Sequence, residues 1–438
     1  MDRGLLRLED AILSRLKGRF SNVHSPEERN ALIGSIAKAL EVDVGSEDVQ
    51  AIISDINDLS PINEMLVSDD VEDVMVNNVS NIFINSATDG SKKLGKKIND
   101  KDELERFVNK LKLYSTNETS QGNILDVHLP NGSRCNIISS PLGYDITIRN
   151  FKKVPFSILD LINRNELTYE IAARLWLYVD GLKIRPANIL IGGMPAAGKT
   201  TLLNAMFSFF RPEQRIVTIE ETYELETETQ ENCVRLETSD SMPMEDLVKN
   251  ALRMRPDMII IGEVRGAEAN DMITAMNIGK ISMGTIHASS TRDIITRLLH
   301  TPMNVPKDIL TVIDALVIVS VVYSGGKAFR AITQISEISG METQVLLSDL
   351  YKFDYKTMKG SMILPSVTYR DNIAKLLGVA PADILAEEKI RATLLEKMNQ
   401  LGKRDIKSIN EMVRGYYDNP GELCNKLGLK GVTAAINV

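Results

Sequence analysis

Residues 188–210 constrain the fold of this chain more than any other stretch. A short apolar run, Asn188–Ile191, precedes G-M-P-A-A-G-K-T at Gly193–Thr200, and a helical pattern continues over Thr201–Phe210. The middle segment fits G-x-x-x-x-G-K-[ST] at every fixed position, and the flanking pattern supplies the strand and the helix that this motif requires. We therefore expect a buried parallel strand, a glycine turn and a helix whose first N–H groups meet in one concavity.

A concavity of this kind binds phosphate, because its N–H groups and the helix dipole both favour an anion. Lys199 is expected to reach the β- and γ-phosphates as the only fixed positive charge at the loop, and the Thr200 hydroxyl is expected to bind Mg²⁺. Gly193 and Gly198 should let the backbone approach the anion closely. The predicted nucleotide-binding residues are Gly193, Met194, Pro195, Ala196, Ala197, Gly198, Lys199, Thr200 and Thr201.

Length and composition narrow the class of protein. The 438 residues are too many for one ordinary core, and 43% hydrophobic and 25% charged residues are typical of a soluble globular protein. The net charge of −8 argues against a protein bound mainly to nucleic acid. The three cysteines are scattered without a C-x-x-C pair, so we expect no disulfide framework, no zinc site and a reducing cytoplasm.

No membrane-spanning or secretory segment is expected. The charged, amphipathic N-terminus lacks the apolar core of a signal peptide. The longest apolar run, Ala315–Val322, is far shorter than the roughly 20 residues that a spanning helix needs. Any association with a membrane is therefore expected to go through a protein partner or a surface helix.

The hydrophobic pattern predicts five parts. They are an N-terminal helical region (residues 1–60), a small α+β domain (61–152), a linker (153–167), an α/β domain around the phosphate loop (168–340) and a helical C-terminal domain (341–438). Strands and helices alternate from residue 189 onward, which favours a parallel-rich, doubly wound sheet. The helices expected in that domain are Thr201–Phe210, Pro243–Arg255, Ala267–Ile278, Thr291–His300 and Lys307–Asp314.

Polar residues follow several strands of that sheet, and ligands of such sheets bind outside the carboxyl ends of the strands. Glu263 follows the apolar Met258–Ile261 and could orient and deprotonate a water molecule, although Gly262 stands where this motif usually has Asp. Glu220 and Glu221 follow another strand and need a metal or an arginine to balance their charge. We expect them either to position the metal, with Glu221 binding it through a water molecule, or to activate the attacking water. His287 is expected to contact a γ-phosphate. The alternatives are solvated acids and a core histidine.

Taken together, these segments resemble the secretion and pilus-assembly ATPases, which include type II and type IV secretion motors, type IV and Tad-type pilus motors, and archaellum motors. The resemblance lies in GGMPAAGKTT, TIEETYEL, IIIGEVRGAEA and MGTIHASS, with LPNGSR and ITIRNF further upstream, and covers roughly residues 60–340. MNVP at Met303–Pro306 and the helical tail resemble the archaeal and Tad-like branch most closely.

The resemblance implies a homohexamer of two-domain subunits with a RecA-like P-loop ATPase domain. ATP and Mg²⁺ would lie between this domain and the N-terminal domain, and Arg134 and Arg149 match the family's N-terminal arginines that complete the site. Without the resemblance, the pattern favours a surface or salt-bridging arginine at each of these two positions. Glu221 stands where Asp is common, and the loop interior M-P-A-A replaces small polar residues. The four-cysteine zinc module of some members is absent, so we expect no zinc.

The expected function is ATP hydrolysis that moves pilin or substrate, from the cytoplasmic side, at a polytopic membrane platform protein, with no direct binding of nucleic acid. Three alternatives remain open. A RecA-like helicase or recombination ATPase should show a basic surface and DNA-stimulated hydrolysis. A GTPase or small-molecule kinase should prefer another nucleotide, but the chain has no N-K-x-D guanine motif. A noncatalytic ring scaffold would not need Lys199, Glu263 and His287.

Overall fold

The computed structural model describes the chain except for residues 1–2, 17–18, 21–22, 24, 41–45, 69, 87–89, 116–122, 151–154, 240, 326, 430–435 and 437–438. The chain divides into two compact units, Met1–Val154 and Pro155–Val438. The expected boundary between the α+β domain and the linker, at residues 152 and 153, falls within 151–154 and so lies outside the described residues. Each unit is described by itself.

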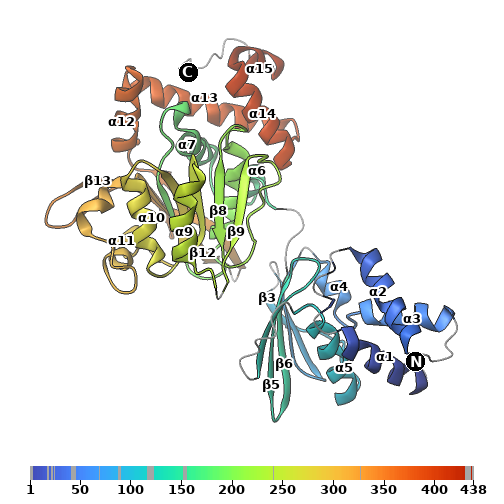
Figure 1. Cartoon of the computed structure of the whole chain (residues 1–438). Coiled ribbons are helices and arrows are strands. Elements are labelled where there is room, and N and C mark those ends of the chain that lie inside the picture. The colour runs from blue at the N-terminus through green and yellow to red at the C-terminus, as the bar shows by residue number, and fades with distance from the viewer. Residues whose placement is uncertain are drawn as a thin grey trace. The chain divides into compact units, whose positions relative to one another are not determined.

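The first unit combines helices with one antiparallel sheet (Figure 1). Its described helices are α1 (Arg3–Leu16), α2 (Pro26–Ala39), α3 (Ser46–Asn57), α4 (Asn63–Leu66) and α5 (Lys101–Lys112). Its strands are β1 (Val71–Asn78), β2 (Asn81–Ser86), β3 (Gly90–Lys93), β4 (Ile124–His128), β5 (Arg134–Ser140) and β6 (Gly143–Arg149), in the order β3-β2-β1-β6-β5-β4. The predicted turn at Asn131-Gly132 joins β4 to β5, and Gly132 has the positive φ of 87° that such a turn requires.

Alternation along the strands places the core of this unit on one face of the sheet. Cys135 and Ile137 of β5 and Ile146 and Ile148 of β6 are buried and join one apolar cluster with residues of the helices. The intervening residues of both strands point to the opposite face, because successive side chains of a strand alternate. Any functional residue at those positions is therefore held by a rigid sheet without being part of its core.

The second unit is built on a mixed sheet. Its strands are β7 (Ile189–Gly192), β8 (Ile216–Glu220), β9 (Cys233–Glu237), β10 (Met258–Val264), β11 (Ile281–Ile286), β12 (Ala315–Ser324), β13 (Lys327–Met341), β14 (Val345–Asp354) and β15 (Lys359–Met362). Their order is β15-β14-β13-β12-β7-β11-β10-β8-β9. The pairs from β12 to β9 are parallel, as the alternating pattern predicts, and β13, β14 and β15 add an antiparallel edge.

Helices cover both faces of this sheet, and β10 shows why. Met258 and Ile260 belong to one apolar cluster, and Ile259 and Ile261 to another, so alternate side chains of one buried strand serve two cores. The described helices are α6 (Ile158–Asn163), α7 (Tyr169–Asp180), α8 (Lys199–Met206), α9 (Met244–Ala251), α10 (Glu268–Asn277), α11 (Thr291–Leu299), α12 (Thr368–Leu377), α13 (Pro381–Gln400), α14 (Ile406–Asp418) and α15 (Pro420–Lys426). The fold is thus α/β and RecA-like.

One element differs from the sequence pattern. The α-helix expected over Lys307–Asp314 is wrong: Lys307–Val312 is a 3₁₀ helix between prolines and a buried strand, with room for only a short, tight turn. After residue 340, β14 and β15 extend the sheet before the C-terminal helices begin. The helices α6 and α12–α14 pack into the same cluster as α7 and α8. None of the described helices has the length and apolar character needed to cross a membrane.

Candidate nucleotide-binding site

The phosphate loop lies between the buried strand β7 and helix α8, as its motif predicts. At Gly193 a Cβ atom would lie 2.6 Å from the carbonyl oxygen of Val319, and Gly198 has a φ of 98°, which L side chains rarely adopt. Both glycines are therefore required by the backbone path. The loop between them exposes Met194, Pro195 and Ala196, whereas Ala197 is buried.

Lys199 is the first residue of α8, and its side chain folds back over the loop. It is 8% exposed. Its Nζ donates to the carbonyl oxygens of Gly193, at 3.0 Å, and Met194, at 3.3 Å, and lies 3.3 Å from His287 Nδ1. The ammonium group thus stands over the concavity formed by the loop and the start of the helix, where an anion would bind. Thr200 and Thr201 follow it in the first turn and are half-buried.

Two predicted residues from neighbouring parallel strands meet beside Lys199. His287 follows β11 directly, and Glu263 lies near the end of β10. His287 Nε2 is 3.0 Å from Glu263 Oε1, and both side chains are about one-third exposed. Since a lysine ammonium can only donate, the imidazole tautomer that suits both neighbours accepts at Nδ1 and carries its proton on Nε2, facing the carboxylate. The histidine therefore bridges the lysine and the acid.

The acidic stretch is balanced by an arginine. The guanidinium group of Arg265 pairs with the carboxylate of Glu221, and its Nε lies 3.6 Å from Glu263 Oε1. We expected either a metal or an arginine to balance these carboxylates, and Arg265 is an arginine in that position. The role of Glu221 toward Mg²⁺ stays a prediction. Within the described part of the chain, no group of three or more His, Cys, Asp or Glu side chains is arranged to hold a metal ion.

Glu220 ends β8 and is buried, with 2% of its surface exposed. Its Oε1 accepts hydrogen bonds from the backbone N–H groups of Glu224, at 2.8 Å, and Leu225, at 2.9 Å. Burial raises the pKa of Glu220 to about 7. A Cβ at Gly262 would lie 3.1 Å from Glu220 Cγ, so the neighbouring strand supplies a carboxylate beside the position where this motif usually has Asp. A side chain at position 262 would press against Glu220.

The sequence pattern missed an arginine at the phosphate loop. Arg330, from β13, donates from Nε to the carbonyl oxygen of Ala196 at 2.9 Å. The expectation that Lys199 is the only fixed positive charge at the loop is therefore wrong. A single arginine within a predicted strand carries no motif, whereas Arg265 stands inside the Gly-Glu motif and could have been proposed from its neighbours.

The two arginines predicted for the N-terminal domain lie side by side in the first unit. Arg134 of β5 and Arg149 of β6 are direct partners in the antiparallel register. Arg134 is half-buried and Arg149 is exposed, on the face opposite the core. Fifteen positions apart in sequence, they are thus brought together by one hairpin of the sheet.

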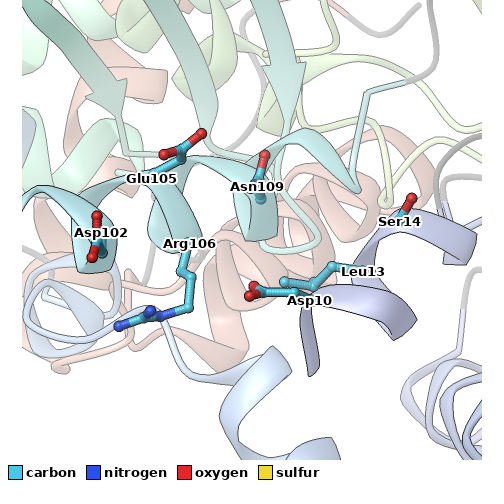
Figure 2. Close-up of a pocket in the computed structure, with 7 residues that line it drawn as sticks. All are labelled: Asp10, Leu13, Ser14, Asp102, Glu105, Arg106 and Asn109. Atoms are coloured by element: carbon cyan, nitrogen blue, oxygen red, sulfur yellow. The ribbon is translucent and has the colours of Figure 1, made fainter. Parts of the chain in front are cut away.

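The first unit also contains a cavity of about 430 Å³ between α1 and α5 (Figure 2). Its charged lining consists of Asp10, Asp102, Glu105 and Arg106. Three carboxylates and one guanidinium group give it a net negative charge, which repels a phosphate.

Comparison with known proteins identifies the family of this chain. Residues 55–324 match the family model of the type II/IV secretion system proteins. An uncharacterized protein of Methanocaldococcus jannaschii is 34% identical over 312 residues, which are 67% of this chain and 56% of that protein. A probable conjugal transfer protein, TrbB, of Sinorhizobium fredii is 40% identical over 115 residues, 25% of this chain and 35% of that one. The match thus spans 56% of the length of the Methanocaldococcus jannaschii protein and 35% of the length of TrbB.

Solved structures with related folds share less sequence. The VirB11 ATPase of the Brucella suis type IV secretion system is 24% identical, with 64% of this chain and 96% of that chain covered and a TM-score of 0.33. The ATPase DotB of Legionella pneumophila is 18% identical, with 80% and 94% covered and a TM-score of 0.46. Because the family model matches well over half of the sequence, this chain belongs to the type II/IV secretion system proteins, the superfamily of secretion and pilus-assembly ATPases.

Proposed function

We propose that this chain hydrolyses ATP at the phosphate loop. The observation that carries the proposal is the contact series from Lys199 through His287 to Glu263, with distances of 3.3 and 3.0 Å. It joins a phosphate-binding cation to a carboxylate through one imidazole. A general base must lie close to the water that attacks the terminal phosphate, and this series supports such a position for Glu263.

The loop fits a nucleotide. Its glycines leave no space for side chains where the backbone would approach the phosphates, and Lys199 is already held over that surface. In the proposal, residues 193–201 bind the phosphates, and Thr200 is the side chain that would hold Mg²⁺. A bound Mg²⁺ would neutralise phosphate charge, and it is usually held by one or two protein ligands together with phosphate oxygens and water.

Each strand-end residue then has a distinct part in the chemistry. Glu263 orients a water molecule and takes its proton, and His287 holds that carboxylate and contacts the γ-phosphate. Arg265 pairs with Glu221 and lies 3.6 Å from Glu263, and so balances the charge of both carboxylates. Glu220 shapes the acidic loop through its two backbone hydrogen bonds, and its raised pKa makes it partly protonated near neutral pH. We retain Glu220 and Glu221 as candidates for water activation and metal positioning.

Beyond hydrolysis, we propose a motor. A homohexamer would use domain closure to bring Arg134 and Arg149, from residues 61–152, to ATP bound by residues 168–340. The work would drive filament assembly or protein secretion at a polytopic membrane platform protein, from the cytoplasmic, inner face of the membrane. Membership of the family and the conjugal-transfer and secretion proteins among its relatives support this role.

The test separates binding from chemistry. In Glu263→Gln, ATP binding should persist while kcat falls by roughly 10²–10⁴, the usual contribution of a positioned base. Titration of the purified full-length protein with ATP gives the dissociation constant, and phosphate release gives kcat. Asp246→Asn, which removes an exposed carboxylate of α9, is the matched control and should behave as wild type. Equal loss of binding and turnover in Glu263→Gln would assign Glu263 a structural or metal-binding role instead.

A further inference from the structure

The phosphate loop contains a tight turn with an unusual residue in it. Ala197 N–H donates to the carbonyl oxygen of Met194 at 3.2 Å, Pro195 follows Met194, and Ala196 has a φ of 59°. These are the hydrogen bond, the proline position and the positive φ of a type II β-turn. The third position of such a turn is normally glycine or asparagine, because a Cβ is strained there. Here it is alanine.

Arg330 reaches this turn from β13. Its Nε donates to the carbonyl oxygen of Ala196 at 2.9 Å. Its Cδ lies 3.2 Å from the place that a Cβ would take at Gly198, the loop's other position with a positive φ. Arg330 pairs in register with Val321 of β12, so its backbone is held within the sheet. One side chain anchored in the sheet thus bonds to one left-handed residue of the loop and lies beside the other.

The contact holds a particular peptide group. The peptide between Ala196 and Ala197 carries the oxygen that accepts from Arg330 and the N–H that donates to Met194. With both ends bonded, this peptide cannot turn over without losing two hydrogen bonds. Its orientation sets the path into Gly198 and α8, where the N–H groups that would face a phosphate begin.

We propose that Arg330 is a positioning residue, which keeps the phosphate loop in its anion-binding shape by holding the carbonyl group of strained Ala196. The effect on nucleotide affinity rests on the proposed function, whereas the effect on the loop does not. A glycine at position 196 adopts a positive φ without strain and needs less support. The importance of Arg330 should therefore depend on which residue occupies position 196.

A double-mutant cycle tests this dependence. The proteins are wild type, Arg330→Gln, Ala196→Gly and the double variant, all full length, with ATP affinity measured by titration and kcat and KM by phosphate release. Arg330→Gln should weaken ATP binding roughly three- to tenfold, as the loss of one hydrogen bond predicts, and should raise KM more than it lowers kcat. In the Ala196→Gly background, Arg330→Gln should change the logarithm of the ATP dissociation constant by less than half as much as it does in wild type.

Amide hydrogen exchange provides a readout without nucleotide. Peptides covering residues 194–206 should exchange severalfold faster in Arg330→Gln than in wild type, and this difference should shrink in the Ala196→Gly background. Lys352→Gln, which removes an exposed cation of β14, is the charge-matched control and should change neither exchange nor affinity. Thermal melts establish that all variants are folded.

The outcomes are distinct. Equal losses of affinity with and without Ala196→Gly would mean that Arg330 acts as a cation on the phosphates, and would overturn the positioning role. Unchanged exchange in Arg330→Gln would overturn it as well. If the wild-type protein neither binds nor hydrolyses ATP, the proposed function fails, while the exchange data still decide whether Arg330 holds the loop.

Discussion

Arg134 and Arg149 face each other across the antiparallel pair of β5 and β6, in register and on the face of the sheet opposite the core. Arg149 also lies directly opposite Asp73 of β1 on its other side, so a carboxylate stands in the same row of the sheet. The antiparallel pairing thus brings the two arginines proposed to act at the nucleotide onto one face of the sheet.

We predict that Arg134→Ala and Arg149→Ala each leave the melting temperature nearly unchanged, because neither side chain belongs to the core of the unit. Each should lower ATP hydrolysis strongly, up to the roughly 10³–10⁵ that an arginine at the transferring phosphoryl group can contribute. Phosphate release and thermal melts measure the two effects. Lys93→Ala, an exposed cation of the same sheet, is the control. Full activity in both arginine variants would remove both residues from the mechanism.

If the chain forms the proposed homohexamer, mixed rings test where these arginines act. Subunits with Arg134→Ala or Arg149→Ala are combined with Glu263→Gln subunits, and stable mixed rings are confirmed by native mass spectrometry. If the arginines act on a neighbouring subunit's nucleotide, some sites regain an intact Glu263 and an intact arginine, and activity rises above that of both parents. No rise would place the arginines at their own subunit's site.

Lys199→Ala is predicted to abolish tight ATP binding and hydrolysis. The ammonium group contacts two loop carbonyl oxygens and His287. Affinity should fall by roughly 10²-fold or more, because charged hydrogen bonds to phosphate are lost. Arg330 remains near the loop, so weak residual binding is compatible with the prediction. Arg253→Ala, at an exposed site, is the control, and near wild-type turnover in Lys199→Ala would disprove the assigned site.

The stability of the first unit should depend on pH through Glu9. This carboxyl group of α1 is fully buried, with Lys110 at 3.5 Å. Burial, and to a smaller extent the neighbouring Asp55, raises the pKa of Glu9 to about 7. Between pH 4.5, its ordinary pKa, and 7, the unfolded chain releases this proton and the folded chain keeps it. Stability from this group is therefore complete below 4.5 and is lost as pH rises through 7.

Glu9→Gln should remove that dependence and stabilise the unit at pH 8 by roughly 1–3 kcal/mol relative to wild type. Melting temperatures between pH 4.5 and 8 measure it, with Asp10→Asn, an exposed carboxylate of the same helix, as the control. A wild-type melting temperature that rises with pH over this range, and does so equally in Glu9→Gln, would contradict the assignment.

Arg391→Met should destabilise the second unit by roughly 3–5 kcal/mol, since it leaves buried carboxylates without a partner. Arg391 is 2% exposed and contacts Asp180 and Glu387 at 2.9 Å each, with its guanidinium carbon 4.8 Å from the ring centre of Trp176. Calorimetry measures the loss, and Lys389→Met, an exposed cation on α13, is the control. A small effect would mean that the C-terminal helices are a dispensable attachment to the ATPase unit.

Much of the site follows from residues that are adjacent in sequence. The strand, the glycine turn and the first turn of α8 form where G-M-P-A-A-G-K-T predicts, because their geometry depends on the backbone preferences of consecutive residues. Likewise Glu263 and His287 follow apolar segments, and parallel strands place their carboxyl ends at one edge. The sequence by itself therefore determines the phosphate loop and the set of residues at that edge.

Other features depend on which strands become neighbours. Glu220 fills the space beside Gly262 only because β8 pairs with β10. Arg330 reaches Ala196 across 134 positions because β12 lies between β7 and β13, an order set by side-chain packing over the whole sheet. Contacts of this kind carry no local pattern, since each is a packing solution among residues far apart in the chain. The sequence alone thus determined the phosphate-loop motif and the edge residues, and only the tertiary structure decided which charges support them.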